Sequence, residues 1–228
     1  MKKKVNRLRV AIDGPAASGK NTLAKQIAKK YKLLHLDSGK LYRYFALQVY
    51  QSKDQKVNYS KLKQALKKLT LKKLKDKKLT TEPVTKIASI ISKKKRIRQM
   101  LKKVQHNLAY NPPKKFKGSV LDGRDIGTVI MPDAHVKVYL TASLNVRAIR
   151  RYKEYKKIGI NTTLAKVKSD IKKRDYEDTH RKISSLKPAK DAVLLDSSFY
   201  NTKAAFVEID KVIRNEIKRL NATKHKSL

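Results

Sequence analysis

Apolar residues follow two different patterns along this chain, and segments of the two kinds alternate. Short runs of aliphatic and β-branched residues, bounded by glycine or polar residues, predict buried β-strands. Such runs occur at Leu8–Asp13, Leu33–Leu36, Gly118–Asp122, Val136–Leu140 and Ala192–Asp196. Longer segments with apolar residues every three or four positions predict amphipathic helices. These segments are Thr22–Lys32, Leu41–Tyr50, Glu82–Tyr110, the stretch after Ser143 through Tyr155, Thr162–Asp178 and Thr202–Leu220.

Local signals refine three of these elements. Pro83 falls in the first turn of the long predicted helix Glu82–Tyr110, where a missing backbone N–H is tolerated. The hydroxyl of Ser143 is suited to cap the helix that follows it. Between Val57 and Lys78 the chain is rich in lysine and leucine, with apolar residues at helical intervals at Leu62, Leu66 and Leu69.

Strands that alternate with helices predict an α/β layered fold around a mainly parallel sheet. In sheets of this kind, ligands bind beyond the carboxyl ends of the strands. We therefore expect functional residues directly after the predicted strands.

Length and composition narrow the class of protein. A chain of 228 residues is long enough for one or two domains with a proper core. The absence of cysteine excludes a disulfide scaffold, a thiolate zinc site and a cysteine nucleophile. No run approaches the length of a membrane span, and Asp13 and Gly14 interrupt the apolar stretch that follows the N-terminal lysines too early for a signal peptide. We expect a soluble, cytoplasmic protein.

The formal net charge of +40 allows two interpretations. A basic surface could bind nucleic acid, or the excess could be lysine dispersed over solvated faces. Of the 58 basic residues, 45 are Lys and 13 are Arg, and the lysines occur almost everywhere without a nucleic-acid-binding motif. Because lysine is so abundant, a position that keeps Arg is a candidate for two-pronged phosphate binding.

A glycine-rich segment follows the first predicted strand and opens the first predicted helix. It has the spacing G-x-x-x-x-G-K of a phosphate-binding P-loop, in the strand–loop–helix context that this motif requires. Its residues are Gly14, Pro15, Ala16, Ala17, Ser18, Gly19 and Lys20. Asn21 stands where a magnesium-binding hydroxyl is usual, and Thr22 follows it. The alternative is a glycine-rich connector that binds nothing.

Three further groups of polar residues follow predicted strands or share a helix face. Asp37-Ser38-Gly39 with Arg43 is either part of a site or only a turn and a helix start. Asp122–Asp125 ends a strand and carries Arg124, a candidate phosphate ligand. Arg174, Asp178 and Arg181 lie on one helix face, either as phosphate and sugar ligands or as a surface ladder of ion pairs.

Taken together, these segments resemble the bacterial cytidylate kinase family of P-loop nucleoside monophosphate kinases. The likeness runs over nearly the whole chain in the same order. The segments that carry it are Ile12–Thr22, Leu36–Arg43, Leu121–Pro132, Val138–Ser143, Arg174–Arg181 and Leu186–Asp196.

The resemblance implies transfer of a phosphoryl group from ATP to CMP or dCMP, with Mg²⁺ accompanying ATP. It also implies a role for each matched residue. Gly14–Thr22 would hold the ATP phosphates, with Lys20 as a catalytic cation. The acceptor phosphate would lie among Ser38, Arg43, Arg124 and Arg181, with the ribose on Asp178. Ser89, Arg98 and Asp125 would read the cytosine. Arg150, Arg151 and Arg174 would close over the transferring group.

The resemblance further implies a three-layer fold with a single domain over residues 1–228. Its core would comprise residues 5–52, 118–150 and 190–222, with an NMP-binding insertion at about 53–112 and a lid at about 152–175. The protein itself would offer no dedicated metal ligand, apart from the Thr22 hydroxyl. We expect a monomer without a membrane or specific nucleic-acid partner. A monophosphate kinase for AMP or UMP, and a basic nucleic-acid-binding protein with a vestigial P-loop, remain alternatives.

Overall fold

The computed structural model describes residues 7–52 and 54–225 and divides the chain into two compact units. The core unit comprises the chain up to Leu36 and from Asn107 onward, and the helical unit comprises Asp37–His106. The helical unit begins earlier than the insertion expected at about 53–112, and residues 5, 6 and 53 of the predicted boundaries lie outside the described residues. The division into core, insertion and lid stays a prediction.

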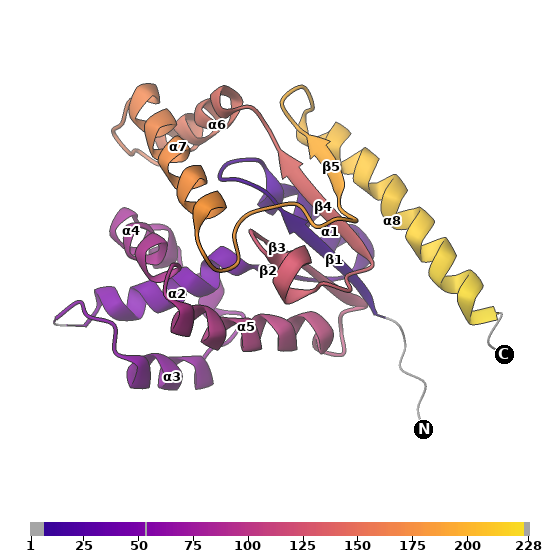
Figure 1. Cartoon of the computed structure of the whole chain (residues 1–228), viewed down its shortest axis with the longest axis horizontal. Helices are drawn as coiled ribbons and strands as arrows, with labels where there is room; N and C mark the ends of the chain where they lie inside the picture. The colour runs from indigo at the N-terminus through magenta and orange to yellow at the C-terminus, as the bar shows by residue number, and fades with distance from the viewer. Residues whose placement is uncertain (1–6, 53, 226–228) are drawn as a thin grey trace. The chain divides into compact units, whose positions relative to one another are not determined.

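The described part of the core unit is built on a parallel sheet with the order β2-β3-β1-β4-β5 (Figure 1). Its strands are β1 (Leu8–Asp13), β2 (Leu34–Asp37), β3 (Gly118–Gly123), β4 (Val136–Thr141) and β5 (Val193–Asp196). The register places Asp13 beside both Gly123 and Tyr139, so the carboxyl ends of β1, β3 and β4 meet at one edge. The strands predicted from the apolar runs are confirmed, and each boundary is within one residue.

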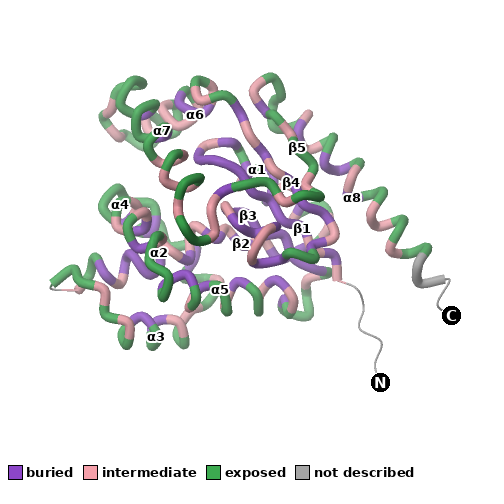
Figure 2. The backbone as a smooth tube through the Cα atoms, viewed as in Figure 1, coloured by how far each residue is buried: buried purple, intermediate pink, exposed green. Residues whose placement is uncertain are grey.

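The helices of the core unit are α1 (Lys20–Tyr31), α6 (Leu144–Lys157), α7 (Leu164–His180) and α8 (Thr202–His225). The apolar faces of α1 and α8 pack with β1, β3 and β4 in one cluster that includes the fully buried Ile12, Ile27 and Ile209. Figure 2 shows the central strands buried along most of their length. As predicted, the hydroxyl of Ser143 caps α6 by accepting a hydrogen bond from the amide of Val146.

The helical unit contains α2 (Ser38–Tyr50), α3 (Tyr59–Lys67), the 3₁₀ turns η1 (Lys73–Lys75) and η2 (Lys77–Thr80), α4 (Glu82–Ile91) and most of α5 (Lys95–Tyr110). The single long helix predicted over Glu82–Tyr110 is wrong, because α4 ends at Ile91. Ser92 donates its hydroxyl hydrogen bond to the carbonyl of Ser89, and the amide of Lys94 turns back to the carbonyl of Ile91. Such short-range bonds tighten and end a helix.

A short π-helical turn, η3 (Ile126–Ile130), was not predicted. The amides of Val129 and Ile130 both donate to the carbonyl of Asp125, and the amide of Met131 donates to the carbonyl of Ile126. Single π-helical turns are frequent at functional sites. This turn directly follows Arg124 and Asp125, two of the residues implied in substrate binding.

Candidate active site

The glycine-rich loop that the sequence predicts to bind phosphate lies at the carboxyl end of β1. Gly14 has a φ of 151°, and a Cβ there would lie 1.9 Å from the carbonyl oxygen of Leu140, so no larger residue fits. Ala17 and Gly19 also have positive φ. Positive φ values within a tight loop turn backbone amides toward one concave surface, and the start of α1 adds the positive end of its dipole. The loop therefore has the form of an anion site.

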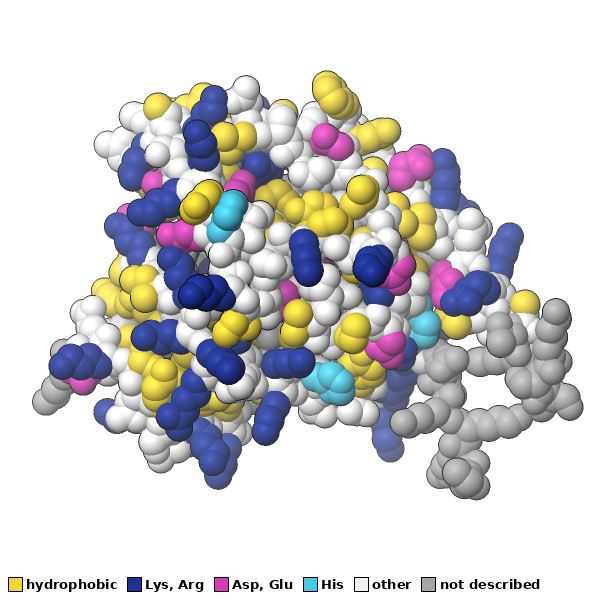
Figure 3. Space-filling model, viewed as in Figure 1, with side chains coloured by type: hydrophobic (Ala, Val, Ile, Leu, Met, Phe, Trp, Pro, Cys, Tyr) yellow, Lys and Arg dark blue, Asp and Glu magenta, His cyan; other side chains and the backbone are white. Residues whose placement is uncertain are grey.

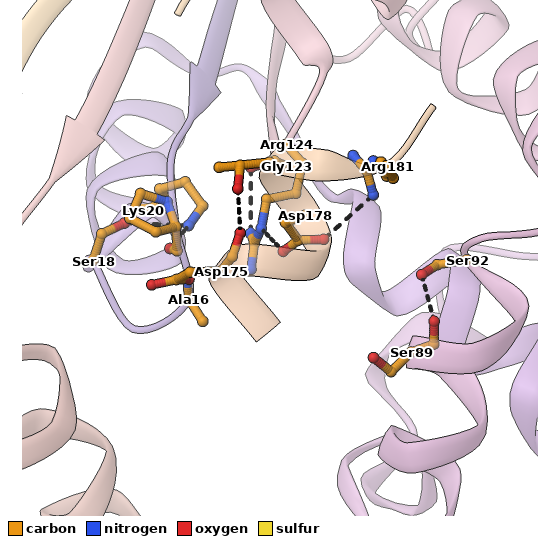
Figure 4. Close-up of polar contacts among 12 residues, drawn as sticks. Ala16, Ser18, Lys20, Ser89, Ser92, Gly123, Arg124, Asp175, Asp178 and Arg181 are labelled. Atoms are coloured by element: carbon orange, nitrogen blue, oxygen red, sulfur yellow. Dashed lines mark hydrogen bonds and ion pairs between the residues drawn. The ribbon is translucent and has the colours of Figure 1, made fainter. Parts of the chain in front are cut away.

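The side chain of Lys20 is buried inside this loop. Its Nζ donates to the carbonyl of Pro15 at 2.6 Å and to the hydroxyl of Ser18 at 3.2 Å (Figure 4). Burial lowers the pKa of Lys20 well below its usual value, and the nearby Arg124 lowers it further. A bound phosphate would place negative charge next to this ammonium group. Phosphate binding and the charged form of Lys20 would therefore stabilise one another.

Arg124 and Arg181 converge on one carboxylate. Arg124 Nε donates to Asp178 Oδ2 at 2.7 Å, and Arg181 Nη1 donates to Asp178 Oδ1 at 3.3 Å (Figure 4). Arg181 is also held by the carbonyl of Ser184, to which its Nε donates at 2.6 Å. The predicted group Arg124, Asp178 and Arg181 is therefore brought together from the end of β3 and the end of α7.

The charge of Asp178 depends on these arginines. Burial alone raises the pKa of a carboxyl group, but Arg124, Arg174 and Arg181 outweigh it and hold the pKa of Asp178 below its ordinary value. Asp178 is thus ionised at neutral pH and keeps two guanidinium groups side by side despite their like charge. Such a pair is suited to binding the oxygens of a phosphate.

The three arginines implied for the lid differ in their surroundings. Arg150 on α6 donates to the hydroxyl of Ser197 at 3.0 Å and to its carbonyl at 2.7 Å, which ties α6 to the segment after β5. Arg151 pairs with Glu154 at 3.1 Å on its own helix. Arg174 lies near enough to Lys20 and Asp178 to affect the pKa of both. The catalytic roles of these arginines stay predictions.

A junction between α6, α7 and the glycine-rich loop was not predicted from the sequence. The carboxylate of Asp175 on α7 accepts a hydrogen bond from the amide of Ala16 at 3.4 Å and pairs with Arg147 of α6. Arg147 in turn donates to the carbonyls of Ala16, at 3.2 Å, and Ala142, at 2.8 Å. Arg147 is one of the few arginines of the chain, so the scarcity of arginine was the available signal.

Four residues of the predicted set belong to the helical unit: Ser38, Arg43, Ser89 and Arg98. Ser38 is buried in the first turn of α2, which the Asp37 carboxylate caps by accepting from the amide of Lys40. Arg43 lies on the same helix. The predicted residues on α4 and α5 are linked through the break between these two helices.

Ser89 on α4 and Arg98 on α5 were predicted to share one helix, but the break between the helices connects them instead. Arg98 is buried and donates to the carbonyl of Ser92 at 3.1 Å, while the hydroxyl of Ser92 donates to the carbonyl of Ser89 at 2.8 Å. The guanidinium of Arg98 also lies 5.5 Å from the ring centre of Tyr42. Within the helical unit, the break between α4 and α5 therefore orients Arg98 relative to Ser89.

Nε2 of His35, on β2, lies 2.6 Å from Asp122 Oδ1 at the end of β3, so this pair ties neighbouring strands together. This contact gives His35 a structural role.

Basic side chains are spread over the visible face of the molecule rather than gathered in one patch (Figure 3). Acidic and apolar side chains interrupt them. On this face, the arrangement favours the interpretation of dispersed lysine over that of a nucleic-acid-binding stripe. No helix in the part of the chain that the structure describes is long and apolar enough to cross a membrane.

The described residues fit ATP with a magnesium ion held mainly by phosphate oxygens and water. Among residues 7–52 and 54–225, no cluster of three or more acidic or histidine side chains has the arrangement of a metal site. The loop instead offers backbone amides, Lys20 and the exposed hydroxyl of Thr22 on the first turn of α1. Mg²⁺ commonly keeps several waters and binds through substrate phosphates.

A glycine-rich loop after the first strand of a 2-3-1-4-5 parallel sheet, with Arg124 directly after the neighbouring strand β3, is typical of a P-loop nucleoside monophosphate kinase. A solved structure from Eubacterium ventriosum, described as an uncharacterized protein, has a similar fold with a TM-score of 0.53 at 14% identity, covering 91% of this chain and 98% of its own. The family model described as Cytidylate kinase matches residues 10–218, and the chain belongs to this family.

Named relatives agree with this assignment. A protein of Streptococcus mutans named Cytidylate kinase is 39% identical, over 93% of this chain and 98% of its own length. A protein of the same name from Bradyrhizobium diazoefficiens is 46% identical, over 83% of this chain and 87% of its own length. The resemblance stated from the sequence motifs is therefore confirmed, and membership of a kinase family implies the use of ATP.

Replacing Asp178 by Asn should make the stability of the fold less dependent on pH. Because its folded pKa is depressed, the Asp178 carboxylate stabilises the fold above its unfolded pKa, and this contribution is lost as the pH falls through the folded pKa. Urea unfolding at pH 7 should give Asp178→Asn a free energy of unfolding lower by about 1–3 kcal/mol. The difference in free energy of unfolding between the parent and the variant should become smaller as the pH falls from about 5 to 3.

Asp170→Asn is the matched control, because Asp170 lies on the same helix in an exposed pair with Lys166 and should contribute less than about 1 kcal/mol. Equal stability of Asp178→Asn and the parent at pH 7 would contradict the role of Asp178 as the link between the two arginines.

Proposed function

We propose that this protein transfers the γ-phosphoryl group of Mg²⁺-bound ATP to CMP and dCMP, forming the diphosphates and ADP. The observation that carries the proposal is the loop around Lys20, which has the geometry of a phosphate cradle at the carboxyl end of β1. The match to the cytidylate kinase family over residues 10–218 supports the choice of acceptor.

The donor side of the site is the phosphate loop. Backbone amides of Gly14–Thr22 surround the β- and γ-phosphates, and Lys20 exchanges its contacts with Pro15 and Ser18 for phosphate oxygens. Thr22 and water would help to hold Mg²⁺, which would neutralise part of the charge of the phosphates. Because Lys20 is buried, its charge acts in a region of low dielectric constant, where it stabilises the transition state more strongly than in water.

The acceptor side is made of guanidinium groups and hydroxyls. Arg124 and Arg181, spaced by Asp178, bind the phosphate of CMP together with Ser38 and Arg43, and the Asp178 carboxylate takes a ribose hydroxyl. Ser89, Arg98 and Asp125 read the cytosine edge. Arg150, Arg151 and Arg174 stabilise the transferring group. The transition state of phosphoryl transfer is loose and rich in negative charge, so positioned cations rather than a general base accelerate it.

A panel of acceptors tests the reaction and its base preference. Formation of ADP in a coupled assay with ATP and Mg²⁺ should be fastest with CMP and dCMP, and kcat/KM for UMP and AMP should be lower by at least about tenfold, a difference of about 1.4 kcal/mol in transition-state binding. Faster reaction with AMP than with CMP would overturn the choice of base. Absence of CDP would overturn the proposed reaction.

Substitution of Lys20 by Ala should lower kcat by at least about 100-fold, because it removes a buried cation aimed at the transferring group. Steady-state kinetics with CMP measures the effect. Lys25→Ala is the control, since Lys25 is exposed on the same helix and should leave kcat within about twofold. A kcat of Lys20→Ala within tenfold of the parent would exclude Lys20 from the transfer.

Replacing Arg124 by Lys keeps the positive charge and removes the planar, two-pronged donor. We expect kcat/KM for CMP to fall by about tenfold or more, equivalent to about 1.4 kcal/mol. Arg219→Lys serves as the control, because Arg219 is exposed on α8. If kcat/KM of Arg124→Lys equals that of the parent, binding of the acceptor phosphate does not need the planar guanidinium group of Arg124.

A further inference from the structure

Asp13, the last residue of β1, holds the π-helical turn that follows Arg124 and Asp125. The side chain is buried, and each of its oxygens accepts one backbone hydrogen bond. Oδ1 accepts from the amide of Ile126 at 2.8 Å, and Oδ2 accepts from the amide of Gly127 at 2.7 Å. One carboxylate from a neighbouring strand thus binds the first two amides of η3.

These two amides need an acceptor from outside the turn. The first amides of any helix have no partner within it, and the residue that precedes η3, Asp125, makes no side-chain cap. A buried amide without an acceptor costs about 1–3 kcal/mol. Asp13 on β1 therefore caps η3 in place of a residue at the start of this turn.

The result is a short segment held at both ends. On one side, the parallel ladder fixes Gly123 beside Asp13. On the other side, the carboxylate of Asp13 fixes Ile126 and Gly127. Only Arg124 and Asp125 lie between these two points, so the backbone of both residues has little freedom to move.

We propose that Asp13 is a positioning residue for the acceptor nucleotide. Its carboxylate sets the backbone from which Arg124 reaches the acceptor phosphate and Asp125 reaches the base. This inference rests on the proposed function. Asp13 itself would not contact the substrate.

The electrostatic surroundings of Asp13 give the proposal a distinctive pH dependence. Burial raises the pKa of Asp13 to about 7, although the amides of Gly127 and Ile126 lower it, and the nearby Asp125 raises it further. Other ionisable side chains near Asp13 are Lys20 on α1, Arg124 after β3, and Lys137 and Tyr139 on β4. A protonated carboxyl group can no longer accept from both amides, so positioning should weaken as the pH falls through 7.

Stability should follow the opposite trend. The folded pKa of Asp13 lies above its unfolded value of 3.8, so its contribution to stability is full below that value and is lost as the pH rises through about 7. A role of Asp13 in stability alone would therefore not lower the activity of the protein between pH 8 and pH 6, apart from the effect of the CMP phosphate. A positioning role makes it less active at pH 6.

The test compares Asp13→Asn with the parent between pH 6 and 8.5. At pH 8, we expect KM for CMP to rise at least fivefold while KM for ATP changes less than twofold. The acid limb of kcat/KM for CMP with an apparent pKa near 7 should be present in the parent and absent in the variant. Titration of the CMP phosphate is common to both proteins and cancels in the comparison. Glu208→Gln on α8, which also converts a carboxylate to an amide, should leave every parameter unchanged.

A folded Asp13→Asn protein with an unchanged KM for CMP, or with the same acid limb as the parent, would overturn the proposal. If the variant does not fold, calorimetry of the parent with cytidine decides, because cytidine has no phosphate to titrate. Binding should be several-fold weaker at pH 6 than at pH 8, and equal affinity at both would overturn the positioning role. Formation of CDP by the parent separates this outcome from failure of the proposed function itself.

Discussion

Charged groups that are buried at the carboxyl edge of the sheet must be compensated by one another, and this constraint organises the core unit. Asp178 is ionised because Arg124 and Arg181 bind it, and it keeps those two cations together in turn. Asp175 and Arg147 form a second pair, which also contacts the backbone of Ala16. Breaking a buried pair leaves an isolated charge at high cost. The arrangement of the site and the stability of the fold therefore depend on the same contacts.

The elements of the fold were largely predictable from the sequence because the apolar pattern is strong. Leu8–Asp13 and Val136–Leu140 are short runs rich in aliphatic and β-branched residues, and the observed strands coincide with them within one residue. The break between α4 and α5 was missed because neither glycine nor proline marks it. The hydrogen bond from Ser92 to Ser89 ends α4 instead, and serine is too common in helices and loops to signal such an end.

The members of the site were predicted better than their contacts. The loop around Lys20 has a fixed spacing, so its form follows from the sequence. The bond between Asp175 and Ala16 joins residues 159 positions apart, and that between Asp13 and Gly127 joins residues 114 positions apart. Neither follows from local pattern. Arg147 stands out in the sequence only as an arginine among many lysines, and the structure supplies a reason for it, since its guanidinium donates to Ala142, Ala16 and Asp175 at once.

The packing of α6 and α7 has a consequence for the order in which parts of the protein open. Their apolar contacts form a small cluster around Ala148, Val167 and Ile171, separate from the main core between the sheet, α1 and α8. A segment with little buried apolar area exchanges its amide hydrogens through local opening at a lower free energy than the core strands. We therefore expect the amide hydrogens of α6 and α7 to exchange through local opening before those of the buried strands β1, β3 and β4.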